Sequence, residues 1–168
     1  MIFIDSSNFY RCIKGQFNKT NVDFLKLADK LYAGRKLIRI YYYNAIVRRE
    51  DDEKRYRDQQ RFFNKLKNIP YLEPRLGRLE KRNGAVVEKG VDVKIATDMI
   101  KGAYHNAYDT AILISGDADF FPAVEAVKDS GKHVENAFVK IGQSIQLRQT
   151  CDKFILLDEN VMNDCWLY

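Results

Sequence analysis

Two aspartates separated by one residue follow the most apolar run of the chain. The stretch AILISGDADFFPAV covers residues 111–124 and contains Asp117 and Asp119. Asp5 ends the apolar run at the N-terminus, and Asp92 lies in the first turn of a predicted helix. Carboxylates can bind a divalent cation, cap a helix or attack phosphorus. These four aspartates are therefore the candidate site.

The elements that must position these acids follow from the hydrophobic pattern. Short runs rich in branched and aromatic residues alternate with helix-length amphipathic segments, and Asn83-Gly84 is a two-residue hairpin signal. This order predicts an α/β fold in a single domain, residues 1–168, with a mainly parallel sheet, helices on both faces and a small hairpin. The predicted strands cover 1–5, 36–45, a pair within 71–90, 110–115, 132–139 and 153–158, and the predicted helices cover 22–34, 51–68, 91–107, 119–131 and 144–151.

The four acids are expected to meet at one edge of this sheet. Ligands of open parallel sheets bind beyond the carboxyl ends of the strands. If strands 1–5 and 110–115 are neighbours, their ends bring Asp5 and Asp117 together. Converging carboxylates repel one another unless a cation is present, and hard oxygen ligands suit Mg²⁺ or Mn²⁺. The fitting chemistry is phosphoryl transfer to water that a metal activates.

Each acid also has a purely structural interpretation. Asp119 is a plausible N-cap of the helix that follows it, and Asp92 would stabilise its helix through the dipole. If Asp119 caps, Asp117 is not needed as a cap, which favours a site role for it. Asp98 lies about 120° round the helix from Asp92. It is either an outer member of the acidic set or the ion-pair partner of a nearby lysine.

Three further residues are candidate supporting groups. The Asn8 amide could hydrogen-bond a carboxylate or a metal-bound water, and capping of a helix over residues 8–14 is the alternative. Ser115 could bind phosphate or orient Asp117. Lys89 could meet a phosphate, or it could be a solvated loop lysine.

A basic stripe on the helix 51–68 is the candidate contact for a polyanion. Four of its cations are spaced 3, 4 and 4 residues apart, so they share one helix face, and two arginines precede them. The net charge of +5 also favours an acidic partner. A solvated helix face is the alternative, just as the tyrosines at 41–43 either stack on bases or pack in the sheet. The predicted RNA-binding residues are Arg48, Arg49, Lys54, Arg57, Arg61 and Lys65.

The cysteines and the N-terminus bear on the compartment. The three cysteines are scattered and form no CxxC pair, which is typical of a reducing compartment. Asp5 interrupts the apolar start too early for a signal peptide or a membrane span. We expect a cytoplasmic protein without a membrane partner.

Three segments resemble, in order, the motifs of NYN domains in the LabA-like branch of the PIN-like nuclease superfamily. They are FIDSSNFY, EKGVDVKIATDMI and LISGDADFFPAVEAVKDSGKHV. The resemblance implies a Rossmann-like three-layer α/β/α sandwich (PIN-like) and an acidic, Mg²⁺- or Mn²⁺-dependent site that cleaves RNA. Ser6 stands where the first motif often has Gly. The site residues that the motifs imply are Asp5, Asn8, Asp92, Asp98, Asp117 and Asp119.

The preferred hypothesis is a metal-dependent ribonuclease with RNA as its partner. The main alternative is a non-catalytic regulatory module that keeps the acidic pocket but binds RNA or protein. A third interpretation is a phosphatase with an aspartate nucleophile, which the lack of room for a large lid domain disfavours. A homodimer is left open.

Overall fold

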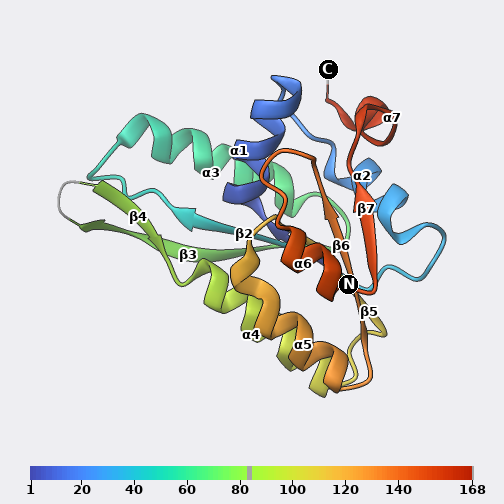
Figure 1. The fold of residues 1–168 in the computed structure, drawn as a ribbon. Helices are drawn as coiled ribbons and strands as arrows, with labels where there is room; N and C mark the ends of the chain where they lie inside the picture. Colours follow the sequence, from blue (N-terminus) through green and yellow to red (C-terminus); the bar gives the residue numbers. More distant parts are fainter. Residues whose placement is uncertain (83–84, 168) are drawn as a thin grey trace.

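Seven strands of the described chain form one twisted sheet between two layers of helices (Figure 1). The computed structural model describes residues 1–82 and 85–167. The strand order is β4-β3-β2-β1-β5-β6-β7, and every neighbouring pair is parallel except β3 and β4. The strands are β1 (Ile2–Asp5), β2 (Ile40–Ile46), β3 (Leu72–Arg82), β4 (Ala85–Lys89), β5 (Thr110–Ile114), β6 (His133–Phe138) and β7 (Lys153–Leu156). The predicted α/β fold is confirmed.

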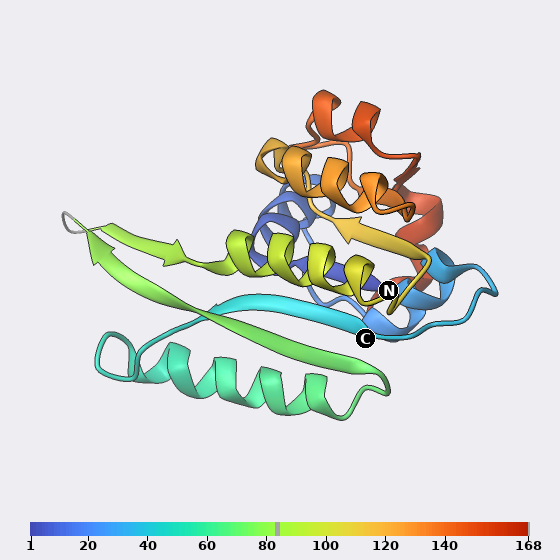
Figure 2. The same ribbon diagram turned by 90° about the horizontal axis from the view of Figure 1, so that it is seen from below.

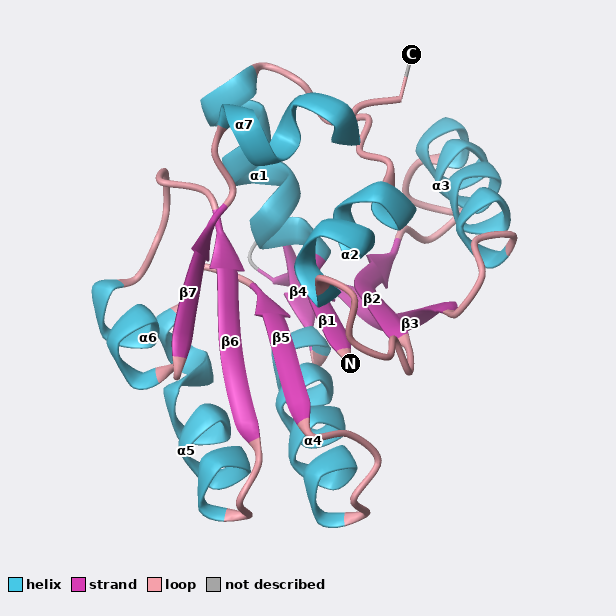
Figure 3. Cartoon of the chain, turned by 90° about the vertical axis from the view of Figure 1, so that its right-hand side faces the viewer, coloured by secondary structure: helices cyan, strands magenta, loops and turns pink. Residues whose placement is uncertain are grey.

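Helices cover both faces of the sheet, as expected for parallel strands joined by crossover connections (Figure 3). One face carries α1 (Ser6–Phe17), α2 (Phe24–Tyr32), α3 (Glu53–Lys67) and the short α7 (Glu159–Met162), and the other carries α4 (Val91–Tyr104), α5 (Phe121–Asp129) and α6 (Ile145–Thr150). The described residues also form two 3₁₀ turns, η1 (Ala118–Phe120) and η2 (Asn163–Cys165). In the part of the chain that the structure describes, no helix has the length and apolarity to cross a membrane.

The two hydrophobic cores explain why the central strands read as continuous apolar runs. Side chains alternate along a strand, so Ile2 and Ile4 of β1 pack under α1 and α2, while Phe3 packs under α4. In β5, Ile112 faces the first core and Leu113 the second. Because both faces of these strands are buried, residues on both sides of each strand are apolar.

The predicted hairpin is formed by β3 and β4, which reach away from the helical layers (Figure 2). β3 pairs in parallel with β2 from Leu72 to Arg78 and then continues as the first arm of the hairpin, paired with β4 from Arg78 onward. The turn predicted at Asn83-Gly84 lies outside the described residues.

Candidate active site

The carboxyl ends of β1 and β5 lie side by side, as the sequence predicted. Ile4 pairs with Ile114, so the residues that follow them leave the sheet at the same point. There the Ser115 hydroxyl donates a hydrogen bond of 2.9 Å to Oδ2 of Asp5. Asp5 is only 4% exposed and Ser115 is fully buried, so the two groups meet away from bulk water.

Ser115 also links Asp5 to Asp117. The backbone N–H of Asp117 donates to the Ser115 hydroxyl oxygen at 3.1 Å, so one buried hydroxyl bonds both the Asp5 carboxylate and the Asp117 backbone. The structural alternative in which Asp119 caps the following helix is wrong, and so is the argument that Asp117 has no capping role. The Asp117 carboxylate accepts from the Asp119 N–H at 3.0 Å and caps η1, because the chain tightens into a 3₁₀ turn before α5 begins. Asp119 is exposed on that turn.

Asn8 closes the network from the other side. Its backbone N–H donates to Oδ1 of Asp5 at 3.3 Å, which makes Asp5 the N-cap of α1. The alternative in which Asn8 caps a helix over 8–14 is therefore wrong, since α1 begins at Ser6, directly after β1. The Asn8 side-chain oxygen accepts from the Gly116 N–H at 3.0 Å. Asn8 thus tethers the loop that carries Asp117 to the helix that Asp5 caps.

The loop after β5 is held by packing as well as by hydrogen bonds. A Cβ on Gly116 would lie 2.1 Å from the carbonyl oxygen of Gly142 and 2.5 Å from the Phe138 ring, so only glycine fits. The Gly116 backbone therefore packs directly against the Gly142 carbonyl and the Phe138 ring. Asn136 of β6 donates to the carbonyls of Leu113 and Ser115 at 3.1 and 2.8 Å. Asn136 was missed in the sequence analysis, and its signal is the polar pair Glu135-Asn136 inside the predicted strand 132–139.

Asp92 and Lys89 lie at the same edge of the sheet. Val91, the first residue of α4, packs so closely on β3 that a Cβ on Gly77 would lie 2.7 Å from its side chain. Gly77 pairs with Ala45 near the carboxyl end of β2, so α4 begins at this edge. Asp92 is exposed in the first turn of α4, and Lys89 is exposed at the end of β4.

Asp98 is bound to the sheet and not to a lysine. The Tyr43 hydroxyl donates to Oδ2 of Asp98 at 2.9 Å, and Tyr43 is the strand partner of Asp5. Burial, together with the negative charge of Asp98, raises the pKa of Tyr43 far above its ordinary value, so the hydroxyl stays protonated and donates. Because Tyr43 is fully buried, it cannot stack on a base.

The acidic groups fit a hard cation in type, but they are spread along the edge. The described residues contain no group of three or more His, Cys, Asp or Glu side chains arranged to hold a metal. The expected convergence of all four acids is therefore not seen there. Mg²⁺ usually keeps several waters and binds through one or two carboxylates together with substrate phosphate. Asp5 and Asp117, joined through Ser115, supply oxygens of that kind.

The predicted basic stripe is partly neutralised within α3. Glu53 accepts from Arg49 at 2.9 Å and from Arg57 at 2.7 Å, and Arg61 lies 3.6 Å from Asp58. Among the described side chains, the cations of the stripe without such an acidic partner are Arg48, Lys54 and Lys65. The charge available to a polyanion is therefore smaller than the count of cations indicates.

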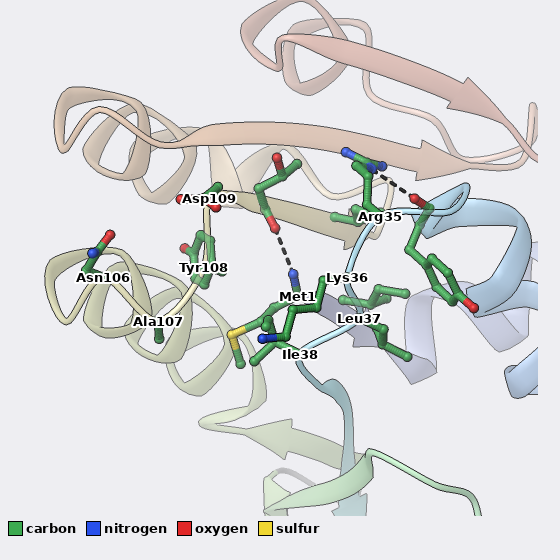
Figure 4. Close-up of a pocket in the computed structure, with 13 residues that line it drawn as sticks. Met1, Arg35, Lys36, Leu37, Ile38, Asn106, Ala107, Tyr108 and Asp109 are labelled. Atoms are coloured by element: carbon green, nitrogen blue, oxygen red, sulfur yellow. Dashed lines mark hydrogen bonds between the residues drawn. The ribbon is translucent and has the colours of Figure 1, made fainter.

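A separate cavity of about 450 Å³ lies at the opposite edge, where β1 and β5 begin (Figure 4). Its lining includes Met1, whose amino group donates to the Thr110 carbonyl at 2.7 Å. Arg35, also in the lining, forms a two-pronged ion pair with Glu135 of β6, with bonds of 3.0 and 2.8 Å. None of the predicted site residues lines this cavity.

Comparison with known proteins agrees with this fold and this set of motifs. The family model of the NYN domain matches residues 1–158. A solved protein of unknown function from Vibrio parahaemolyticus, VPA0982, is similar in structure with a TM-score of 0.74. It shares 26% sequence identity, and the alignment covers 95% of this chain and 92% of that one. No curated protein matches the chain.

Proposed function

The chain belongs to the NYN family, and on that premise we propose that it is a ribonuclease that uses Mg²⁺ or Mn²⁺. The observation that carries the proposal is the buried link between Asp5 and Asp117 through the Ser115 hydroxyl. A buried carboxylate is costly unless it is hydrogen-bonded or paired with a cation. The Asp5 carboxylate is held at the carboxyl end of β1 by α1, whose Asn8 N–H it accepts from, and by Ser115 in the loop after β5.

Asp5 and Asp117 would hold the cation, with Asp92 and Asp119 as further acids along the same edge. When bound, the metal would lower the pKa of water and stabilise charge on the phosphoryl oxygens. The chain's own residues would keep the carboxylates in place. Ser115 orients Asp5, Asn8 fixes the backbone of Gly116, and Tyr43 holds Asp98. Such hydrogen bonds would limit how far Asp5 and Asp98 rearrange when substrate arrives.

RNA is the proposed substrate, with Arg48, Lys54 and Lys65 as the cations of the α3 stripe most available to its phosphates. Lys89, at the end of the hairpin, is a further candidate contact. The LabA-like branch and a cytoplasmic location remain predictions from the sequence.

The second candidate function is a non-catalytic module that binds RNA or protein. It is favoured by one observation, namely that no trio of metal-ligating side chains stands together among the described residues. Such a module would use the same edge of the sheet for association alone.

Cleavage of a labelled RNA pool tests the proposal. The wild-type protein and Asp117→Asn are incubated with Mn²⁺, Mg²⁺ or EDTA. Asn keeps the oxygen that caps η1, so the variant should fold normally while losing the carboxylate charge. We expect metal-dependent cutting that Asp117→Asn reduces by at least about 100-fold, in line with the loss of one group that stabilises charge at the reacting centre.

Asp164→Asn is the matched control. It makes the same chemical change at an exposed residue of η2, where Asp164 forms an ion pair with Lys30 of α2. It should cut as the wild type does. If the folded wild type cuts no RNA with either metal, the ribonuclease proposal is rejected in favour of the binding module.

A further inference from the structure

A groove with aromatic side chains in its lining runs between α1 and α3, on the face of the sheet away from α4. Its cavity volume is about 880 Å³, within the range of small-ligand sites. β2 contributes Tyr42 and Asn44 to it. Tyr10 from α1 and Phe62 from α3 also line it and are 50% and 37% exposed. The Phe62 ring meets Tyr42 edge to face at 5.7 Å.

The Ser6 hydroxyl is the polar group of the groove that lacks a partner among the described residues. Ser6 is only 2% exposed, and its hydroxyl finds no hydrogen-bond partner among the described residues. An unsatisfied buried hydroxyl is destabilising, and a ligand that hydrogen-bonds Ser6 would remove that cost. Ile4 pairs with Tyr42, and side chains alternate along β2, so Asn44 lies on the same face. Ser6 and Asn44 together place a hydroxyl and an amide in the lining.

The groove begins beside the candidate active site. Ser6 follows Asp5 directly in the chain and opens α1, so the residue that lines the groove and the residue that bonds Ser115 are neighbours. A ligand bound at Ser6 would extend toward the edge where Asp5 and Asp117 lie.

The charges that line the groove suit an anion with an apolar, flat part. Arg55 and Lys65 line it, and neither pairs with an acid among the described side chains. Its two carboxylates are engaged elsewhere, since Asp58 faces Arg61 at 3.6 Å and Asp23 caps α2. Exposed aromatic rings beside cations are the usual platform for single-stranded nucleic acid.

We propose that this groove binds one unpaired nucleobase of a single-stranded RNA, next to the nucleotide that is cut. The inference rests on the proposed function and names its substrate class. The base stacks on Tyr10 and Phe62, its polar edge bonds Ser6 and Asn44, and the cations meet the flanking phosphates. Bases of a duplex are already stacked and paired, so they cannot enter.

Fluorescence anisotropy of a labelled single-stranded RNA in EDTA tests the groove separately from cleavage. Tyr10→Ala and Phe62→Ala should each weaken binding about tenfold, the loss expected from removing one stacked ring. Tyr104→Ala is the matched control, because Tyr104 is 75% exposed at the end of α4 and lies outside the groove. It should bind as the wild type does, and a duplex RNA of the same sequence should bind more weakly.

Ser6→Ala gives an independent signature. Removing an unsatisfied buried hydroxyl should raise Tm, whereas losing a contact to the base should weaken RNA binding. A hydroxyl with no role in binding would change Tm alone, and that result would count against the proposal.

The remaining outcomes separate this inference from the proposed function. Unchanged RNA binding by both aromatic variants overturns the groove proposal, even if Asp117→Asn abolishes cleavage. Loss of binding in these variants supports the groove, even if the wild type never cuts RNA. Equal affinity for duplex overturns it. If Tyr10→Ala or Phe62→Ala changes the oligomeric state measured by light scattering but leaves RNA affinity unchanged, the proposal is also overturned. The groove would then be a contact between protein chains.

Discussion

Replacing Ser115 with alanine removes the group that joins the two aspartates of the candidate site. The lost hydroxyl donates to a buried carboxylate at 2.9 Å and accepts from the Asp117 N–H at 3.1 Å. A hydrogen bond to a charged group contributes about 1.5–3 kcal/mol and a neutral one about 0.5–1.5 kcal/mol. Because alanine leaves both partners unsatisfied, we expect Ser115→Ala to lower the free energy of unfolding by about 2–4 kcal/mol.

Urea unfolding followed by circular dichroism measures this loss. Ser144→Ala is the control, because the Ser144 hydroxyl accepts a single neutral hydrogen bond, from the Leu147 N–H at 3.2 Å, as the N-cap of α6. That variant should lose only about 1 kcal/mol. If Ser115→Ala loses no more than Ser144→Ala, the hydroxyl does not hold Asp5 and the reasoning is refuted.

A double-mutant cycle sharpens the test. In an Asp5→Asn background the acceptor is neutral, so Ser115→Ala should cost less than it does beside the native carboxylate. We expect a coupling of about 1 kcal/mol or more between the two positions, as is usual for groups in one hydrogen-bond network. Additive losses would mean that the two side chains act independently.

The other predictions concern the loop after β5 and the response to acid. Gly116→Ala should destabilise the protein by about 1–3 kcal/mol through overpacking, because the new Cβ would clash with the Gly142 carbonyl. Gly15→Ala, at an open position of α1, should raise Tm instead, and thermal denaturation of both variants checks the pair. Burial alone would raise the pKa of Asp152, but a backbone N–H of β6 and a lysine of α5 outweigh it and hold that pKa below its ordinary value. Asp152 therefore contributes stability above its unfolded-state pKa of 3.8, and this contribution is lost as the pH falls through the lower folded-state pKa. The difference in free energy of unfolding between wild type and Asp152→Asn should therefore shrink below pH 3.8. Urea unfolding above and below that pH measures this difference, and a constant difference would contradict the prediction.

The sequence alone predicted the layers of the fold and the placement of two aspartates at the ends of strands. Apolar runs alternate with amphipathic segments, and this local pattern requires a parallel sheet covered on both faces. Asp5 and Asp117 could be placed at strand ends for the same reason, because a strand ends where its apolar run ends. The NYN motifs could be recognised from the sequence because each is a continuous stretch of residues.

The contacts between distant segments were decided by the tertiary structure. Only the strand order places β1 beside β5, and only that neighbourhood lets Ser115 bond a residue 110 positions away in the chain. The cap of η1 depended on where the chain tightened after β5, which a run of SGDAD does not reveal. The groove is likewise formed by α1, α3 and β2, which no short window of sequence contains. Local patterns specify the elements, whereas side chains of different elements meet only after the sheet has brought them together.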